Sequence, residues 1–314
     1  MKAGKREEHH ELLTRVSWMY YIGGMSQQEI AGELSLSRIK VIRLLQKALD
    51  LGIVRISIGD AHYSLYSLEK AIKEITGITY CVVVPSLPDL ADALSRGTAH
   101  LCNDIISMKG RLGVGLSRSI RYLYKYLDRQ KCKVDSVISI GGSTSPNLAL
   151  THLNNGFQIA QALGVDYYTI WAPVIVGEEA DSGVIKKDRY IAMVLEMAQD
   201  SDYTLVGIGN TKTSQLIDMK YITREDFRRI TESRAEGEIM GRYFSIEGKQ
   251  VSVGIEERLI AVQFPMQCPV IGIAGGMDKD KAIVSALRSG WLQGLVTDEH
   301  TAHGILKILR AETM

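Results

Sequence analysis

A run of cationic side chains lies close to the amino terminus, and its spacing indicates contact with a polyanion. The stretch "SRIKVIRLLQKALDLG" spans 37–52. Its cations are Arg38, Lys40, Arg43 and Lys47. On a helix they stay largely outside one apolar stripe, which is formed by Val41, Leu44, Leu45 and Ala48. Guanidinium and ammonium groups on one helix face can bind DNA phosphates and base edges, so the stretch predicts a DNA-reading helix.

The elements around this helix follow the order of a winged helix-turn-helix. Ser26, with Glu29 three residues later, is a capping box that begins a first short helix. The break "SLS" at 35–37 separates it from the second helix, which Gly52 ends. The segment "GIVRISI" then alternates like a strand and predicts a wing. This combination favours DNA binding over the alternative, in which a basic amphipathic helix merely faces water.

Position along the two helices suggests what each side chain contacts. We expect Arg38 and Lys40, near the start of the second helix, to meet base edges. Ile39 and Ile42 also lie off the apolar stripe, where they meet thymine methyl groups or pack on a neighbour. The other cations are expected at phosphates. The whole predicted interface comprises Ser26, Gln27, Ser37, Arg38, Lys40, Arg43, Lys47 and Arg55.

Beyond residue 60, short apolar runs alternate with amphipathic helical stretches. The runs are "TYCVVVP", "RLGVG", "VDSVISIGG", "YYTIWAP", "YTLVGIG", "PVIGIAGG" and "LQGLVTD". Runs of this kind are typical of buried parallel strands, and their alternation with helices predicts right-handed crossovers. The expected fold class is therefore α/β: an N-terminal winged helix-turn-helix and a larger, doubly wound, Rossmann-like sheet that is mostly parallel. The predicted organisation is a DNA-binding domain at 1–60, a linking helix at 61–78 and a larger domain at 79–314.

Small and polar residues follow several of these runs. The segments are "GVGLSRS", "GGSTSP", "GIGNT", "AGGMDKDKA" and "VTDEHTA". In an open α/β sheet, ligands bind outside the carboxyl ends of the strands, where glycines let backbone amides approach an anion. The hydroxyls, the cation Lys279 and the carboxylates Glu238 and Asp298 suit a polyhydroxylated or phosphorylated ligand. The alternative for Asp298 is an N-cap of the last helix.

Other kinds of site find less support. The segment 113–119 is not G-x-G-x-x-G, so we expect no nicotinamide cofactor, and the seven histidines lack zinc-binding spacing, so we expect no metal. A net charge of +1 argues against a general polyanion binder and for a local DNA patch. Scattered cysteines and the lack of a signal peptide or an apolar span predict a cytoplasmic protein.

Three segments carry a resemblance to a known family. They are "YYIGGMSQQEIAGELSLSRIKVIRLLQKALDLGIV", "AEGEIMGRYFSIEGKQV" and "IGIAGGMDKDKAIVSALRSGWLQGLVTDEHTA". Together they resemble the SorC family of bacterial sugar-responsive transcription regulators over nearly the whole chain. Ser35 stands where that family commonly has glycine, which costs about 1 kcal/mol if its φ is positive. Ile42 stands where a small polar residue is common, and Leu116–Ser119 where the family usually has W-G-R-T.

The resemblance implies a fold similar to ribose-5-phosphate isomerase and glucosamine-6-phosphate deaminase for the larger domain, with a sugar or sugar phosphate as effector. It also implies a homo-oligomer, expected to be a tetramer. Carried over by motif position, the effector-binding residues are Ser117, Arg118, Ser119, Gly141, Gly142, Ser143, Gly209, Asn210, Glu238, Lys279 and Asp298.

The leading hypothesis is therefore a DNA-binding transcription regulator of a carbohydrate or polyol catabolic operon, without enzymatic activity. Its partners would be palindromic operator DNA and a sugar, polyol or sugar phosphate. The alternative is an isomerase- or deaminase-like enzyme with an appended DNA-binding domain, for which Glu238 is the candidate general base. A third reading is a constitutive architectural DNA-binding protein whose larger domain only oligomerises.

Overall fold

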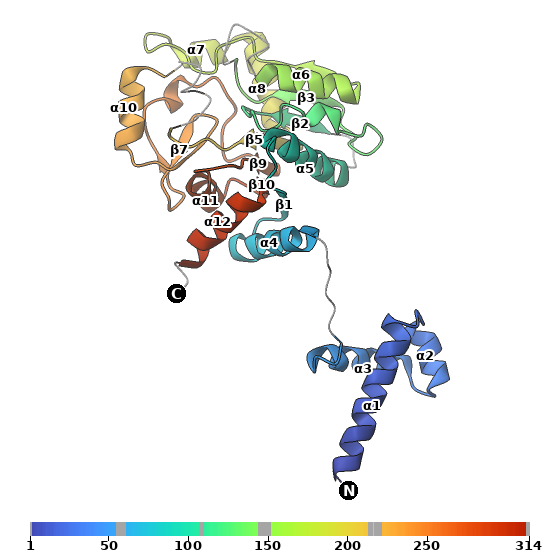
Figure 1. Ribbon diagram of the computed structural model, residues 1–314. Coiled ribbons are helices and arrows are strands. Elements are labelled where there is room, and N and C mark those ends of the chain that lie inside the picture. Colours follow the sequence, from blue (N-terminus) through green and yellow to red (C-terminus); the bar gives the residue numbers. More distant parts are fainter. Residues whose placement is uncertain are drawn as a thin grey trace. The chain divides into compact units, whose positions relative to one another are not determined.

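The computed structural model describes residues 2–54, 61–106, 110–143, 152–212, 216 and 222–311. The chain divides into two compact units, Met1–Asp60 and Ala61–Met314 (Figure 1). Among the described residues, no helix is both long and apolar enough to cross a bilayer.

The first unit is a three-helix domain built around one apolar cluster. Its helices are α1 (Lys2–Tyr21), α2 (Gln27–Glu33) and α3 (Arg38–Asp50). The capping box at the start of α2 is present, because the Ser26 hydroxyl accepts from the Glu29 amide and the Glu29 carboxylate accepts from the Ser26 amide. The predicted stripe of α3 is buried against α1 and α2; it consists of Val41, Leu44, Leu45 and Ala48. The helix-turn-helix is thus confirmed.

The turn between α2 and α3 contains a left-handed residue. Ser35 has a φ of 51°, so this serine does adopt the conformation that glycine adopts without cost. The Ser37 hydroxyl then accepts from the Lys40 amide and caps α3. The predicted wing, 52–58, is described only as far as Val54, and Arg55 lies outside the described residues.

The second unit is built on a seven-stranded sheet whose pairings are all parallel, in the order β1-β10-β9-β5-β2-β3-β4. The strands are β1 (Tyr80–Val84), β2 (Arg111–Val114), β3 (Ser136–Ser139), β4 (Asp166–Tyr168), β5 (Tyr203–Gly207), β9 (Val270–Ile273) and β10 (Gly294–Asp298). Six of the seven apolar runs of the sequence contain a whole strand, and the doubly wound α/β prediction is confirmed. The run "YYTIWAP" holds only the end of β4, because its later residues leave the sheet.

Helices cover both faces of this sheet. The described helices of the second unit are α4 (Ala61–Thr76), α5 (Leu90–Ile105), α6 (His152–Leu163), α7 (Ser182–Lys186), α8 (Arg189–Gln199), α10 (Arg224–Glu232), α11 (Asp280–Arg288) and α12 (Glu299–Ala311), with 3-10 turns η1 (Leu123–Lys125) and η3 (Glu256–Arg258). Alternate strand residues enter different clusters: Val206 packs with α11 and α12 residues, whereas Leu205 packs with α5 and α6 residues. The strands therefore carry apolar side chains on both faces, as parallel strands buried on two sides do.

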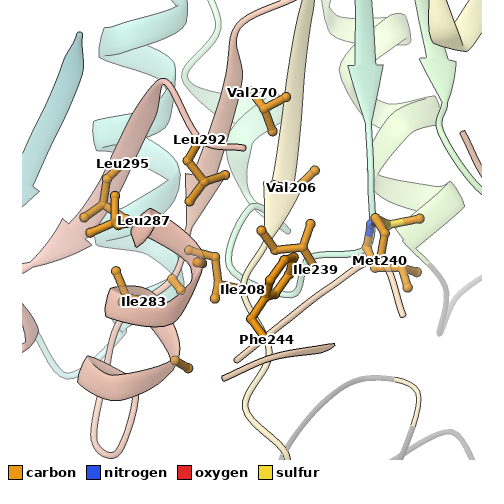
Figure 2. Packing of buried hydrophobic residues seen from close by; sticks show 14 of the residues in the cluster. Val206, Ile208, Ile239, Met240, Phe244, Val270, Ile283, Leu287, Leu292 and Leu295 are labelled. Carbon is orange, nitrogen blue, oxygen red and sulfur yellow. Dashed lines mark hydrogen bonds between the residues drawn. The ribbon is translucent and has the colours of Figure 1, made fainter. Parts of the chain in front are cut away.

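A small antiparallel sheet, which the sequence did not predict, contributes side chains to the apolar cluster that contains Val206. It consists of β6 (Gly237–Ile239), β7 (Arg242–Phe244) and β8 (Gln250–Val251). Met240 and Gly241 form the two-residue turn between β6 and β7, with φ values of 49° and 79°. Figure 2 shows Ile239 and Phe244 of this hairpin beside Val206 and Ile208.

The two edges of the large sheet differ. At the β1 edge, the Glu69 carboxylate of α4 accepts from the backbone amide of Val83 at 2.9 Å, so α4 covers an amide that β10 does not use. Leu65, Leu68 and Ile72 of α4 are buried in the larger unit. The helix that the sequence suggested as a link between domains is therefore packed as part of the second one.

The β4 edge carries exposed apolar side chains instead. Phe157, Trp171 and Tyr190 are 53%, 80% and 72% exposed. They line a broad surface groove together with residues of β4, α6 and α8. Large apolar side chains gathered in one patch mark contact surfaces more often than single exposed ones do.

A buried ion pair ties α10 to η3. The Asp226 side chain is fully buried and the Arg258 side chain is 11% exposed, and the guanidinium donates to the carboxylate. The same carboxylate accepts from the amide and the hydroxyl of Thr223 and completes the capping box of α10. Burial alone would raise the pKa of Asp226, but the bonds from Arg258 and Thr223 hold it below its ordinary value.

Candidate functional site

A cavity lies where β2, β5 and β9 end and where the β6–β7 hairpin meets them. Its volume is about 130 Å³, and its mouth is open to solvent. Its lining consists of Leu116, Ser117, Arg118, Ser119, Gly207, Ile208, Gly209, Glu238, Met240, Ile273, Ala274, Gly275 and Lys279. This is the position where open parallel sheets bind ligands.

Backbone hydrogen bonds hold the walls of the cavity together. The Gly207 amide donates to the Leu116 carbonyl at 2.9 Å, and the amides and carbonyls of Gly209 and Glu238 exchange two bonds of 2.8 Å. A Cβ on Gly207 would lie 2.5 Å from the Leu116 carbonyl oxygen, so only glycine allows this approach. The walls are therefore fixed independently of the polar side chains that face the cavity.

Glu238 is a buried carboxyl group in the cavity wall. One of its oxygens accepts from the Gly241 amide. Burial raises the pKa of Glu238, and this effect outweighs the Gly241 hydrogen bond and the charges of Lys279 and Arg242, which lower it. The side chain thus tends to keep its proton, and a protonated carboxyl can both donate to and accept from a sugar hydroxyl.

Replacing Glu238 with glutamine tests this description. A group whose pKa is raised on folding stabilises the fold below its ordinary pKa and loses that contribution as pH rises through the folded-state value. We expect Glu238→Gln to match the wild type in thermal unfolding at pH 4 and to exceed it by about 1 kcal/mol at pH 8, a typical size for one substitution. A variant that is less stable at pH 8 would mean that the folded protein holds a charged, paired carboxylate.

Two cations line the same cavity. The ammonium group of Lys279, at the start of α11, donates to the Ile208 carbonyl at 3.1 Å and is half-buried. Arg118 is exposed and Ser119 is half-buried. An anionic group in the cavity would therefore meet positive charge from two elements, β2's loop and α11.

The Ser117 hydroxyl differs from the other polar groups of the cavity. Ser117 is 4% exposed, and its oxygen has no hydrogen-bond partner in the part of the chain that the structure describes. The loop that carries it is anchored elsewhere, because Asn155 of α6 donates to the Ser117 carbonyl at 2.8 Å.

Met240 closes one side of the cavity. It is buried, and its sulfur accepts from the Leu116 amide at 3.3 Å. A Cβ on Gly115 would lie 3.1 Å from the Met240 sulfur, and one on Gly141 would lie 2.6 Å from its methyl carbon. The methionine therefore fills the space between the loops that follow β2 and β3.

The predicted effector residues divide into two groups. The structure brings together Ser117, Arg118, Ser119, Gly209, Glu238 and Lys279 in the cavity lining. It leaves out of the lining Gly141, Gly142, Ser143, Asn210 and Asp298. The loop after β3 instead pairs with the segments around Pro173 and Ala261, in isolated bridges at Ser143 and Gly141.

The Asp298 carboxylate is already hydrogen-bonded within the fold. Its carboxylate accepts from the hydroxyls of Ser86 and Thr301 and from the amides of Gly276 and Thr301. These bonds use the acceptor capacity of both oxygens, in keeping with the capping alternative weighed from the sequence. We therefore no longer expect Asp298 to contact the effector. Asn210 likewise bonds within its own loop and to Asp278.

Several lining residues were not named individually from the sequence, although five of them lie in the segments "GVGLSRS", "GIGNT" and "AGGMDKDKA". They are Leu116, Gly207, Ile208, Met240, Ile273, Ala274 and Gly275. Most of them lie where β5 and β9 end. The feature of the sequence that could have identified them is their position directly after an apolar run, because their own side chains are not polar. Met240 had no such signal, because its place in the wall depends on the unpredicted β6–β7 hairpin.

The cationic face of α3 is open to solvent. Arg38, Lys40, Arg43 and Lys47 are all exposed, and Ile39 and Ile42 between them are 64% and 42% exposed. Ser26 and Ser37 are exposed as well, at the starts of α2 and α3, where their hydroxyls cap the helices, and Gln27 is half-buried. One helix thus presents cations and aliphatic side chains together, the combination that reads base edges and thymine methyl groups.

Comparison with known proteins finds similarity along almost the whole chain. A family model described as "Putative sugar-binding domain" matches residues 39–307. The erythritol catabolism regulatory protein EryD of Brucella abortus (strain 2308) is 26% identical over 94% of this chain and 96% of its own. The transcriptional regulator LsrR of Enterobacter sp. (strain 638) is 27% identical over 98% and 96%.

The fold is also similar to that of solved structures. The full-length sorbitol operon regulator SorC from Klebsiella pneumoniae matches with a TM-score of 0.73 and 23% identity, over 95% of this chain and 99% of that one. This likeness extends across both units of the chain and concerns the fold alone.

Proposed function

The chain belongs to the SorC family of sugar-responsive transcription regulators, and we propose that it controls a carbohydrate or polyol catabolic operon. In this proposal the first unit binds operator DNA through α2 and α3. The second unit binds a sugar, polyol or sugar phosphate in the cavity between β2, β5, β9 and the β6–β7 hairpin. We also propose that the protein acts in the bacterial cytoplasm, because that is where operator DNA is found.

The observation that carries this proposal is the composition of the cavity wall. Two cations, a buried carboxyl group whose pKa is raised, and the buried hydroxyl of Ser117 surround one space at the carboxyl ends of parallel strands. These groups suit a ligand with several hydroxyls and an anionic group. On the DNA side, the proposed contacts are Arg38 and Lys40 to bases, and Arg43 and Lys47 to phosphates.

Coupling between the two sites follows from linkage. An effector that lowers the affinity for DNA must itself bind less tightly to the DNA-bound protein, by the same factor. We propose a non-enzymatic role for the cavity, in line with the names of the relatives, which are transcription regulators. Turnover of sugar phosphates by the purified protein would favour the isomerase- or deaminase-like alternative.

We also propose that the protein acts as a homo-oligomer, at least a dimer. A single helix-turn-helix contacts little DNA, and such domains commonly pair across palindromic half-sites. The apolar groove along the β4 edge, with Phe157, Trp171 and Tyr190, supports a contact surface in the larger domain. We expect light scattering at micromolar concentration to give a multiple of 34.8 kDa; a monomeric mass would contradict this part of the proposal.

The test of the whole proposal measures DNA affinity with and without candidate effectors. Fluorescence anisotropy would follow labelled DNA from upstream of the gene's own operon at two salt concentrations. A panel of pentose, hexose and polyol phosphates with their free sugars would then be added. We expect one compound to shift the affinity at least fivefold, the lower end of usual couplings. Specific DNA binding without any shift would reject the effector role, and no specific binding at low salt would reject the DNA-binding role.

A further inference from the structure

The Ser117 hydroxyl is a buried polar group in the cavity wall that lacks a hydrogen-bond partner within the described part of the chain. The side chain is almost fully buried, yet its oxygen bonds to no group in the described part of the chain. Leaving a buried hydroxyl without a partner is costly, and most buried polar groups in proteins are paired. The hydroxyl therefore either pairs with a group that is not part of the described chain, or it stays unpaired at a cost in stability.

The fold does not need this hydroxyl to position its loop. Asn155 holds the Ser117 carbonyl at 2.8 Å, and the Leu116 carbonyl accepts from the Gly207 amide at 2.9 Å. A Cβ added to Gly207 would lie 3.2 Å from both the Cα and the Cβ of Ser117, so the backbone of the loop is packed closely against β5. These contacts fix the Cα–Cβ direction of Ser117, a residue of the cavity lining, and leave its buried hydroxyl as a preorganised donor and acceptor directly behind the cavity surface.

We propose that Ser117 is a specificity-determining residue, whose hydroxyl is paired by an oxygen atom of the effector. The inference rests on the proposed effector-binding function. An effector with an oxygen at this position satisfies the buried hydroxyl, whereas a deoxy or apolar analogue leaves it unpaired. Discrimination of this kind is strong, because a site built to hydrogen-bond a group rejects ligands that lack it. The oxygen belongs either to a sugar hydroxyl or to a phosphate.

The first arm of the test needs no effector. Ser117→Ala removes an unpaired hydroxyl, so we expect the melting temperature of the full-length protein to stay the same or rise. The matched control is Ser139→Ala, because Ser139 is equally buried but its hydroxyl donates to the Gly141 carbonyl at 2.6 Å. We expect the control to melt about 2–4 °C lower, the shift that the loss of one such bond causes in a domain of this size. An equal loss of stability in Ser117→Ala would overturn the inference, because the hydroxyl would then have a partner in the fold.

The second arm measures the rise in melting temperature with ribose 5-phosphate, glucose 6-phosphate, their free sugars, erythritol and inorganic phosphate. For whichever compound stabilises the wild type, we expect Ser117→Ala to bind about 10-fold more weakly, and Ser139→Ala to bind with unchanged affinity. If the loss persists with the free sugar, the oxygen is a hydroxyl; if it appears only with phosphorylated compounds or phosphate, it is a phosphate oxygen.

The role of Ser117 and the effector-binding function of the cavity can be rejected by different results. If Ser117→Ala binds the stabilising compound as tightly as the wild type, the inference about Ser117 is overturned while the cavity remains an effector site. If no compound on the panel stabilises the wild type, the effector-binding proposal fails in the wild type itself, and the role of Ser117 fails with it.

Discussion

Replacing Arg258 with methionine should destabilise the larger domain by about 3–5 kcal/mol, the usual result of removing one partner of a buried ion pair. The Asp226 carboxylate is fully buried, and no solvent is available to replace the guanidinium that donates to it. Methionine keeps most of the volume of the arginine stem, so the loss would reflect the uncompensated charge rather than a cavity. Urea unfolding of the full-length protein at pH 7, followed by circular dichroism, would measure it.

A surface pair on the same helix is the control. Arg228 of α10 bonds to Glu225 and Glu232, but its side chain is 57% exposed. Exposed pairs contribute little, so Arg228→Met should cost less than about 1 kcal/mol. Combining Asp226→Asn with Arg258→Met should restore part of the stability, because no buried charge is left. Equal effects of the two arginine substitutions would contradict the assignment of Asp226 as a charged, buried partner.

The same ion pair predicts the direction in which stability changes with pH. Because the pKa of Asp226 is lowered in the folded protein, its contribution to stability is present above the ordinary aspartate pKa and is lost as pH falls through the folded-state value. The difference in unfolding free energy between the wild type and Arg258→Met should therefore become smaller in acid and stay constant at neutral pH.

Substituting Arg38 with alanine should reduce discrimination between operator and random DNA by about 1–3 kcal/mol, the value of one good contact between a side chain and a base. Arg38 is the first residue of α3, directly after the Ser37 cap, and is exposed on the face that carries Ile39 and Ile42. In helix-turn-helix proteins, the first residues of the recognition helix are the ones that meet base edges. Anisotropy on an operator and on a shuffled sequence of the same composition would measure the effect.

Lys47→Ala supplies the comparison within the same helix. Lys47 lies in the last turn of α3, and a phosphate contact there should weaken binding to all sequences alike and flatten the salt dependence by about one counterion. If Arg38→Ala lost affinity equally on operator and shuffled DNA, Arg38 would be a phosphate contact and the base-reading role would pass to other residues of α3.

The helix-turn-helix was predictable in detail because its signals are local. A capping box depends on residues three apart, and an apolar stripe on residues three and four apart, so the sequence alone indicated the starts of α2 and α3 and the buried positions of α3. The strands of the large sheet were equally evident, because parallel strands buried on both faces are continuous apolar runs.

The cavity was predictable only in part, because its shape depends on contacts between distant segments. Polar residues after β2, β5 and β9 converge as strand ends in an open sheet are expected to do. Of the residues after β3, the described Gly141 to Ser143 do not line the cavity, since Met240 fills the space beside Gly141. Nothing in the local sequence shows that a hairpin so distant in the chain reaches this point. Asp298 is a similar case: its carboxylate is used by Ser86 and Gly276, which lie far from it in the chain.

The unequal edges of the large sheet limit how the molecule can polymerise. Glu69 and α4 cover β1, whereas no described strand pairs with the outer edge of β4, which borders an apolar groove. Addition of strands to an open sheet at both edges would give a filament, but a sheet with one terminated edge can be extended only once. Any pairing through β4 is therefore self-limiting: two copies join about a twofold axis and the assembly stops. A larger closed particle would need a second contact of different composition. Mutations at the β4 groove should therefore abolish pairing through β4 without affecting that second contact.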